Sequence, residues 1–410
     1  MKSNYKKLGD FIQQVKKRNN DNILTVDNLR GINISKEFMP SVANVTGTDL
    51  SVYKVVEKNQ FAYNPMHVGR DEVLPISMLV NEDKVIVSPA YVIFEIVDTD
   101  KLLSEYLMIW CRRREFDRNA WFTTDSSVRG GFNWEDFCDL ELPVPTLEKQ
   151  KEIIKEYHTI TDRIKLNEQL NKKLEDTAQS IYKEWFVNFE FPDENGNPYK
   201  SNGGEMVYCD ELEIEIPKGW FFDTLQNITS TIDNRGKTPP HFKTKTNLPL
   251  IEIGSLRKDG RIIDLSKCIK YLDQKTYENN FRSGHPQKKD ILFSTVGSLA
   301  ESKIICNEKC SIAQNIVAFR SNEDIGFYLY QYLKNSINSI MQYNIGSVQS
   351  SIKVSQLVEF KVLIPLKEVV KSFETIIDKV TCQIANYTKE IEILSELNGV
   401  LLSKMATIEG

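Results

Sequence analysis

The sequence predicts an α+β protein in which two similar mixed α/β units are separated by two long antiparallel coiled-coil helices, as a pseudo-two-fold internal repeat. Three observations lead to this fold class: one half of the chain matches the other, each half ends in a long heptad pattern, and an acidic segment lies between the halves. The chain has 410 residues, of which 41% are hydrophobic and 27% charged. These values are ordinary for a soluble globular protein with room for roughly two to four domains.

The repeat has an offset of about 220 residues and keeps the apolar class of each position more than its identity. From Ser127 onward no gap is needed, and a weaker upstream match lies at an offset of 225. The matched segments are Ser127 and Val128 with Ser347 and Val348, residues 142–145 (LPVP) with 362–365 (VLIP), and residues 91–94 (YVIF) with 316–319 (IVAF). Solenoid repeats have periods of only ~20–50 residues, so a whole domain with its helix is duplicated here.

Each half is predicted to contain a globular unit, then a strand that ends at proline, then a long helix. Proline ends a strand because it has no N–H to donate, and it is tolerated where a helix begins. The predicted segments are residues 1–147 for the first unit, 148–187 for the first helix, 188–216 for an acidic linker, 217–366 for the second unit and 367–406 for the second helix.

Heptad spacing of apolar residues predicts the two helices. In the second helix, Asn398 interrupts a stripe made of Phe373, Ile377, Val380, Ile384, Tyr387, Ile391, Leu394 and Leu401. In the first helix, Asn167 lies near a stripe made of Ile153, Tyr157, Ile160, Ile164, Leu170, Leu174, Ala178, Ile181 and Trp185. Stripes this narrow need a partner in water. We expect the helices to pack on each other, and the alternative is that each packs on its own globular unit.

The net charge of −5 conceals an uneven distribution along the chain. Residues 217–366 hold 20 Lys and Arg against 13 Asp and Glu, a net +7, whereas residues 188–216 hold one Lys against eight acids, a net −7. Residues 1–147 hold 18 basic and 21 acidic side chains, a net −3. The basic second unit favours a polyanionic partner, and the first unit can share that partner only if its basic residues gather on one face.

Membrane and metal roles are not favoured by the sequence. No apolar run approaches the ~20 residues of a membrane span, and the start of the chain, MKSNYKKLGDF, lacks the apolar stretch of a signal peptide. We therefore expect a cytoplasmic protein without a membrane partner. Of seven scattered cysteines only Cys306 and Cys310 are close, and the four histidines lie apart from them. Free buried thiols are favoured over a metal site, because zinc usually takes four tightly spaced ligands.

With its duplicated unit and helix, the chain resembles the specificity subunits of type I restriction–modification systems over nearly its full length. In the first unit, residues 9–11, 50–53, 61–70, 87–94 and 130–132 are similar to the target-recognition domain of that family. In the second unit, residues 233–239, 290–298 and 346–349 are similar to it. The junction LPVPTLEKQKEI also fits, although Lys367, Glu368 and Val369 replace Thr146, Leu147 and Glu148 at the second junction.

The resemblance implies that each of two target-recognition domains reads one half of a bipartite site in double-stranded DNA. It implies that the helices set the gap and dock two methyltransferase subunits, to which restriction and translocase subunits attach. The chain itself is then not an enzyme and binds no cofactor, because S-adenosylmethionine, ATP and Mg²⁺ belong to those partners. Helices of about 40 residues span about 60 Å, or one to two DNA turns of ~34–36 Å.

The sequence contains no complete motif for the catalytic activities considered next. Residues 64–67 (NPMH) approach the Asn-Pro-Pro-aromatic motif of adenine methyltransferases but lack the second proline and the aromatic residue. An Asn-Pro turn is therefore the favoured interpretation. Pro192 and Asp193 resemble the start of a metal-nuclease motif, yet they lie in an Asn- and Gly-rich linker, and no GxxxxGK[ST] phosphate loop occurs.

Candidate DNA contacts are polar and basic residues predicted to lie on loops between apolar strands, because such side chains read base edges or bind phosphates. The candidates are Tyr63, Asn64, His67, Arg70 and Arg129 in the first unit, and Arg235, Lys237, Thr238, Ser298, Ser347 and Gln349 in the second. The alternative for each residue is a solvated loop position. The runs Arg112-Arg113-Arg114 and Lys16-Lys17-Arg18 are predicted helix surfaces, with phosphate contact as the alternative.

Two other functions remain open from the sequence. A coiled-coil scaffold or adaptor without a DNA role fits the heptads and the net negative charge. A methyltransferase or nuclease with unfamiliar motifs is the weaker alternative.

Overall fold

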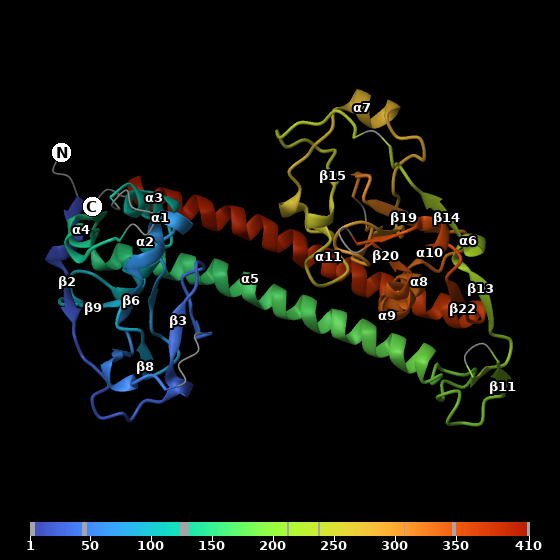
Figure 1. Cartoon of the computed structure of the whole chain (residues 1–410), viewed down its shortest axis with the longest axis horizontal. Helices are drawn as coiled ribbons and strands as arrows, with labels where there is room; N and C mark the ends of the chain where they lie inside the picture. The colour runs from blue at the N-terminus through green and yellow to red at the C-terminus, as the bar shows by residue number, and fades with distance from the viewer. Residues whose placement is uncertain are drawn as a thin grey trace. The chain divides into compact units, whose positions relative to one another are not determined.

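The computed structural model of the chain describes residues 5–42, 47–123, 131–210, 213–236, 238–306, 308–346 and 350–407 (Figure 1). The chain divides into two compact units, Met1–Ile164 with Glu392–Gly410, and Lys165–Ile391. The boundary falls inside both long helices, α5 (Leu147–Tyr182) and α11 (Lys367–Lys404). Each unit therefore contains a globular part and one end of each helix.

The first unit is built on a four-stranded antiparallel sheet with the order β2-β9-β6-β7. Its strands are β2 (Ile12–Val15), β6 (Phe61–Tyr63), β7 (Ile76–Met78) and β9 (Val92–Ile96). Aromatic side chains of β6 and β9 pack with Phe132 and Phe137 in one core. Aromatic and β-branched residues suit such half-buried pleated surfaces.

In the described part of the first unit, three further strand pairs and four short α-helices accompany this sheet. The pairs are antiparallel and join β1 to β10, β3 to β4 and β5 to β8. The elements are β1 (Tyr5–Lys7), β3 (Arg30–Ile32), β4 (Phe38–Pro40), β5 (Lys54–Glu57), β8 (Lys84–Val87), β10 (Glu141–Pro143), α1 (Val68–Asp71), α2 (Ser104–Cys111), α3 (Arg114–Phe122) and α4 (Trp134–Asp139).

The second unit is built on a four-stranded antiparallel sheet with the order β14-β19-β16-β17. Its strands are β14 (Thr229–Ile232), β16 (Ile291–Ser294), β17 (Ser302–Ile304) and β19 (Ile316–Ser321). Successive residues of a strand point to opposite faces. Val317 and Phe319 accordingly enter one hydrophobic cluster, while Ile316 and Ala318 enter another. This sheet is thus covered by apolar side chains on both faces.

Shorter elements surround this sheet. Strands β11 and β12, β13 and β22, and β20 and β21 pair antiparallel, whereas β15 and β18 pair parallel. The elements are β11 (Met206–Cys209), β12 (Ile214–Pro217), β13 (Phe221–Thr224), β15 (Leu250–Ile251), β18 (Ser311–Ile312), β20 (Asn344–Ile345), β21 (Ser351–Ile352), β22 (Lys361–Ile364), α6 (Leu225–Ile228), α7 (Gln274–Asn279), α8 (Gly326–Asn335), α9 (Ile337–Ile340) and α10 (Val354–Leu357).

The two units share one topology, which confirms the predicted internal repeat. Both sheets have the same strand order when β2, β9, β6 and β7 are matched with β14, β19, β16 and β17. Phe94 and Phe319, which the 225-residue offset pairs, occupy matching positions opposite Phe61 and Ile291. In each unit a buried tyrosine of α2 or α8 donates its hydroxyl to a backbone carbonyl of β10 or β22.

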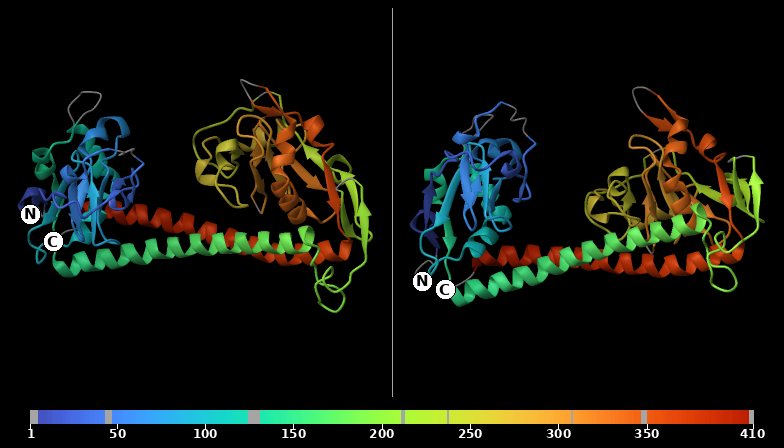
Figure 2. Two further views of the ribbon diagram at one scale, coloured as in Figure 1. Left: turned by 60° about the horizontal axis from the view of Figure 1, so that its bottom comes forward. Right: turned by 90° about the horizontal axis from the view of Figure 1, so that it is seen from below.

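The long helices run antiparallel in each unit, as Figures 1 and 2 show. In the second unit, Tyr182 of α5 packs with Phe373 of α11, and Asn171 Nδ2 donates to Thr388 Oγ1 at 3.2 Å. In the first unit, Ile153 lies in the same core as Met405. The helices therefore pack on each other and also on the globular parts, because these clusters contain residues of both. The two arrangements that the sequence left as alternatives occur together.

The two long helices differ from regular heptad helices at their ends and at one buried asparagine. The first helix ends as regular α-helix at Tyr182, and Lys183–Val187 continue it as a π-helical turn. The second begins at Lys367, the repeat position of Leu147, despite the different residues at its junction. Asn167 is fully buried, and neither amide atom has a hydrogen-bond partner in the described chain. A buried polar residue in a helix seam lowers stability and restricts register.

No helix in the described part of the chain combines the length and the apolar composition that crossing a membrane requires.

The second unit is attached to the helix pair by a buried arginine. Arg261, whose side chain is 0% exposed, donates from Nε and its backbone N to Glu175 Oε1 at 3.0 and 2.7 Å. Its other guanidinium nitrogens reach Glu175 Oε2 at 3.1 Å and Thr381 Oγ1 at 2.9 Å. One side chain of the globular part thus binds α5 and α11 together. Arg suits this position because its planar fork matches a carboxylate.

The loop that carries Arg261 is supported from inside the unit. Lys303 is 2% exposed, and its Nζ donates to the backbone carbonyl oxygens of Lys258 and Gly260. Burial lowers the pKa of the Lys303 amine to about 8. Gly260 has a φ of +92°, which favours glycine, and it lies against Glu175. The loop conformation and the Arg261 ion pair therefore depend on each other.

We predict that Arg261→Met lowers the free energy of unfolding of the second unit by about 3–5 kcal/mol, because Glu175 is left buried without its counter-charge. Urea titration of the full chain measures this change. Arg257→Met, at an exposed arginine four residues earlier, is the matched control and should change stability by less than about 1 kcal/mol. Equal effects of the two substitutions would show that the buried pair is not the tether.

Candidate nucleic-acid interface

In the first unit, the structure corrects one predicted DNA contact. Tyr63 does not lie on a loop: it belongs to strand β6, is 0% exposed, and stacks on Phe137 with ring centroids 4.8 Å apart. Its burial among aromatic rings excludes direct contact with DNA in this conformation. Asn64, the next residue, accepts a hydrogen bond from Met66 N and caps the short 3-10 helix Pro65–His67. The residues 64–67 therefore form a capped turn, as the Asn-Pro pair predicts.

Several other predicted contacts cannot be placed. The side chains of His67 and Arg70, and the whole of Arg129, Lys237, Ser347 and Gln349, lie outside the described residues. Their role in DNA binding stays a prediction.

The two basic runs differ from the predicted helix surfaces. Arg113 is 5% exposed at the junction of α2 and α3, where it pairs with Glu115 at 3.4 Å. Arg112 donates to the backbone carbonyl of Ser35. These residues join elements within the unit because a helix ends and another begins at the run. Lys16, Lys17 and Arg18 are exposed but follow strand β2 rather than lying on a helix.

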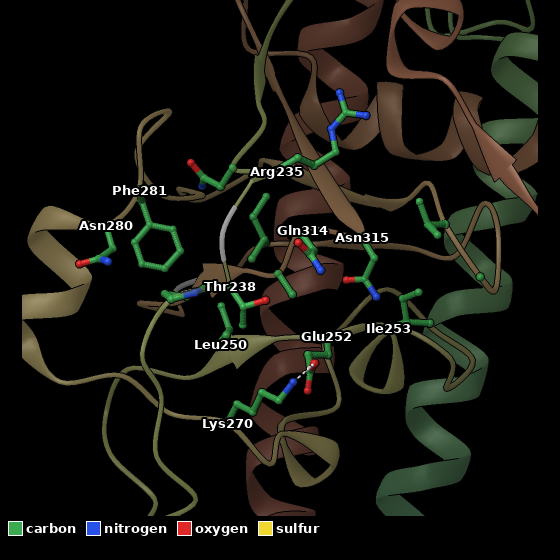
Figure 3. Close-up of a pocket in the computed structure, with 16 residues that line it drawn as sticks. Arg235, Thr238, Leu250, Glu252, Ile253, Lys270, Asn280, Phe281, Gln314 and Asn315 are labelled. Atoms are coloured by element: carbon green, nitrogen blue, oxygen red, sulfur yellow. Dashed lines mark hydrogen bonds and ion pairs between the residues drawn. The ribbon is translucent and has the colours of Figure 1, made fainter. Parts of the chain in front are cut away.

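In the second unit, Arg235 and Thr238 lie at a surface hollow of about 450 Å³ (Figure 3). Its apolar lining comes mainly from the paired strands β15 and β18 and from the turn after β15, with Leu250, Ile253 and Ile312 buried. Its polar lining includes Asn280, Gln314 and Asn315, which are not among the predicted contacts. At one side Lys270 Nζ and Glu252 Oε1 form an ion pair of 2.7 Å.

Arg235 is held at the rim by Asp233. Its Nε lies 2.9 Å from Asp233 Oδ1 and its Nη2 lies 2.5 Å from Asp233 Oδ2. Burial opposes ionisation of Asp233, but the hydrogen bonds from Arg235 keep the pKa of this carboxyl below its usual value. The same partner raises the pKa of Arg235. The Arg235 side chain is nevertheless 44% exposed to solvent.

Hydrogen bonds between side chains and backbone groups attach this rim to the segment that carries Phe281. Ser283 N donates to Asn234 Oδ1 at 3.0 Å, and Asn234 Nδ2 donates to the carbonyl oxygen of Gly284 at 2.9 Å. Arg282 Nε donates to the Asp233 carbonyl oxygen at 3.2 Å and leaves its side chain 68% exposed. Two segments far apart in sequence thus place Arg282 beside Asp233, the partner of the hollow-lining Arg235, and both arginine side chains are exposed.

The opposite wall is the short loop between β18 and β19. Ala313 N donates to the Ile251 carbonyl at 2.9 Å, Ile316 N to the Ala313 carbonyl at 3.0 Å, and Thr295 N to the Asn315 carbonyl at 3.0 Å. The backbone on either side of Gln314 is therefore fixed. Figure 3 shows Gln314 and Asn315 together on this wall, with Phe281 and Asn280 across the hollow.

Ser298 lies near this region but is engaged within the protein. Its hydroxyl accepts a hydrogen bond from Arg257 Nε at 3.1 Å, and its carbonyl oxygen accepts one from Ser294 Oγ at 2.6 Å. Gly297, with a φ of +85°, lets the chain turn after β16. Gln314 and Asn315 escaped the sequence analysis because a Gln-Asn pair after a short apolar strand carries no motif. Only the pairing of β15 with β18 brings them to the hollow.

The side chains at the hollow suit recognition of a nucleic acid. Amides line the hollow and exposed arginines lie at and beside its rim, and such groups bind base edges and phosphates. In the described part of the chain, no group of three or more His, Cys, Asp or Glu side chains is arranged to hold a metal ion. Cys306 and Cys310 are buried free thiols, and burial raises the pKa of Cys306 to about 12.

Comparison with known proteins agrees with this chemistry. Residues 217–395 match the family described as the type I restriction modification DNA specificity domain. The specificity subunit of the type I restriction enzyme MjaIX from Methanocaldococcus jannaschii is 25% identical over 316 residues, which cover 76% of this chain and 70% of that protein. The specificity subunit of the type I enzyme HindI from Haemophilus influenzae is 26% identical over 153 residues, covering 36% of this chain and 32% of that protein.

A solved structure extends the likeness in fold to nearly the whole chain. The S subunit of a type I restriction-modification system from M. genitalium has a TM-score of 0.58 at 14% identity and covers 99% of this chain and 96% of that chain. The duplicated α+β units and the two long helices accompany the sequence matches to two curated subunits. The chain is therefore similar to the specificity subunits of type I restriction–modification enzymes over most of its length, and residues 217–395 match their DNA specificity domain.

Proposed function

We propose that this chain selects the DNA sequence for a type I restriction–modification complex and that each unit reads one half of a bipartite site. The observation that carries the proposal is the repeated topology: one fold occurs twice, and the second copy lies within the matched DNA specificity domain. Two copies of one recognition fold suit two separate patches of duplex, just as dimeric DNA-binding proteins use two half-sites. The exposed arginines at and beside the hollow support DNA as the ligand of the second unit.

The helices α5 and α11 act in this proposal as the spacer between the half-sites. They contain 36 and 38 residues. A helix of this length extends for about 55 Å, roughly one and a half turns of duplex at ~34–36 Å per turn. A stretch of DNA between the half-sites then remains unread.

The helices also provide a docking surface for methyltransferase subunits in this proposal. Ile393, Leu397 and Val400 are 56%, 49% and 49% exposed and follow one another at helical spacings of four and three residues on α11. They form an apolar stripe apart from the heptad positions that face α5. Such an exposed stripe fits a partner helix. The corresponding repeat positions on α5 are the polar residues Lys173, Thr177 and Ser180.

The proposed division of labour leaves the chemistry to other chains. The methyltransferase subunits carry S-adenosylmethionine, the attached restriction and translocase subunits use ATP and Mg²⁺, and this chain contributes recognition alone. Such a complex acts on DNA in the cytoplasm.

Sequencing of methylated adenines in the host tests the proposal. With the chain and its methyltransferase partner present, we predict methylation within a motif of two specified blocks separated by unspecified bases. Deletion of the gene for this chain should abolish that motif, and the methyltransferase gene alone should not restore it. A motif made of one uninterrupted block, or methylation that persists after the deletion, contradicts the proposal and favours a scaffold role.

Arg235→Ala tests the proposed phosphate contact at the hollow. We expect affinity for DNA to fall by a similar factor for cognate and non-cognate duplexes, and the slope of log K against log salt to decrease by about 1, because one phosphate contact is lost. Fluorescence anisotropy of the full complex at several salt concentrations measures both. Lys218→Ala, at an exposed lysine paired with Glu205, is the control. Unchanged affinity and slope in the Arg235 variant would remove this residue from the interface.

Leu397→Glu tests the proposed docking stripe. We expect at least a 10-fold weaker association with the methyltransferase subunit, because a carboxylate is placed in an apolar contact, while the thermal unfolding midpoint of the isolated chain stays unchanged. Analytical ultracentrifugation of the mixed subunits measures the association. Ser403→Glu, at an exposed position on the same helix, provides the control for added charge. Normal association of the Leu397 variant would place the dock elsewhere.

A further inference from the structure

We propose that Gln314 is a specificity-determining residue of the second unit and reads an adenine in its half-site. This inference rests on the proposed function and deepens it, because it assigns one base of the site to one side chain. The first observation that supports it is the exposure of the Gln314 amide. The side chain is exposed, lines the hollow, and makes no hydrogen bond within the described chain.

The loop that carries Gln314 presents it on a fixed backbone. Three backbone hydrogen bonds of 2.9–3.0 Å hold this loop: Ala313 N donates to Ile251 of β15, Ile316 N donates to Ala313 within the loop, and Asn315 accepts from Thr295 N. Thr295 is itself buried, and its carbonyl oxygen accepts from Ile352 N at 2.8 Å. A reading side chain on such a loop loses little backbone entropy when it binds, which favours precise placement at a base edge.

The surroundings of Gln314 supply the other parts of a base-reading site. Asn315 contributes a buried Oδ1 atom that has no hydrogen-bond donor in the described chain. The buried side chains Leu250 and Ile312 form an apolar floor, which is unsuited to a phosphate but compatible with the edge of a base. Arg235 lies at the rim, and Arg282 contacts Asp233 beside it, so both exposed side chains can hold the backbone of the same duplex. In this arrangement the amide groups of Gln314 and Asn315 would contact base edges, and the arginines would contact phosphates and position the protein.

The chemistry of the amide selects the base. A glutamine side chain offers one donor and one acceptor in a plane, and this pair matches the N7 acceptor and N6 donor of adenine in the major groove. Guanine presents two acceptors there and leaves the amide oxygen without a donor. Gln287 is also an exposed glutamine of this unit, but it does not line the hollow. Gln314 thus has both the exposure and the position that reading requires.

The experiment uses the full chain in complex with its methyltransferase partner. The split motif is first determined for the wild-type chain, and its absence would overturn the proposed function rather than this inference alone. Binding of Gln314→Ala is then measured on duplexes with every single base-pair substitution in the second half-site. We expect the preference for one adenine, about 10- to 100-fold in the wild type, to disappear in Gln314→Ala while preferences at the other positions remain. Gln287→Ala should keep the whole motif.

A modified base separates direct reading from a structural effect of the substitution. Replacement of that adenine by 7-deazaadenine removes the N7 acceptor and keeps base pairing. We expect it to weaken wild-type binding by roughly the same factor as the alanine substitution, and to have no further effect on Gln314→Ala. Full retention of the motif by Gln314→Ala, or equal sensitivity of both proteins to 7-deazaadenine, would overturn the inference.

Discussion

The buried ion pair between Arg261 and Glu175, with Thr381 as third partner, joins the globular part of the second unit to both long helices. Removal of two charges from water is costly, and this pair is favourable only because the guanidinium and carboxylate are closely matched and the backbone N of Arg261 adds a further bond. Lys303 and Gly260 hold the loop in the required conformation. The position of the recognition surface on the helix pair depends on this contact.

The same sheet carries different loops in the two units, as the proposed reading of two different half-sites requires. The strand order recurs, and Phe94 and Phe319 occupy equivalent strand positions in the two units. The hydrogen bond from a buried tyrosine to β10 or β22 recurs as well. The loops do not recur in the same way: the hollow of the second unit depends on the parallel pair β15 and β18, whereas β5 and β8 of the first unit pair antiparallel. The core sets the fold, and the loops set what is recognised.

The fold followed from the sequence because its signals are periodic. Buried apolar residues recur at regular spacing. Examples are the heptad positions Phe373 and Ile377, the strands that end at proline, and the matched segments that contain Phe94 and Phe319. The site did not follow, since a loop residue has no such period. Tyr63 is polar by composition but belongs to the aromatic core, and Gln314 reaches the hollow only through strand pairing distant in sequence. Arg235 could be named as a candidate because polar and basic residues on loops between apolar strands are the side chains that contact DNA, and the structure places it at the hollow.

Whether the chain samples DNA at two patches is the central question, and hydroxyl-radical footprinting of the methyltransferase-bound chain on its own site tests it most directly. The account predicts two protected patches of the duplex with an accessible stretch between them, and loss of protection in one patch alone when the loops of one unit are exchanged for those of a relative. A single continuous patch, or loss of both patches after that exchange, would contradict it.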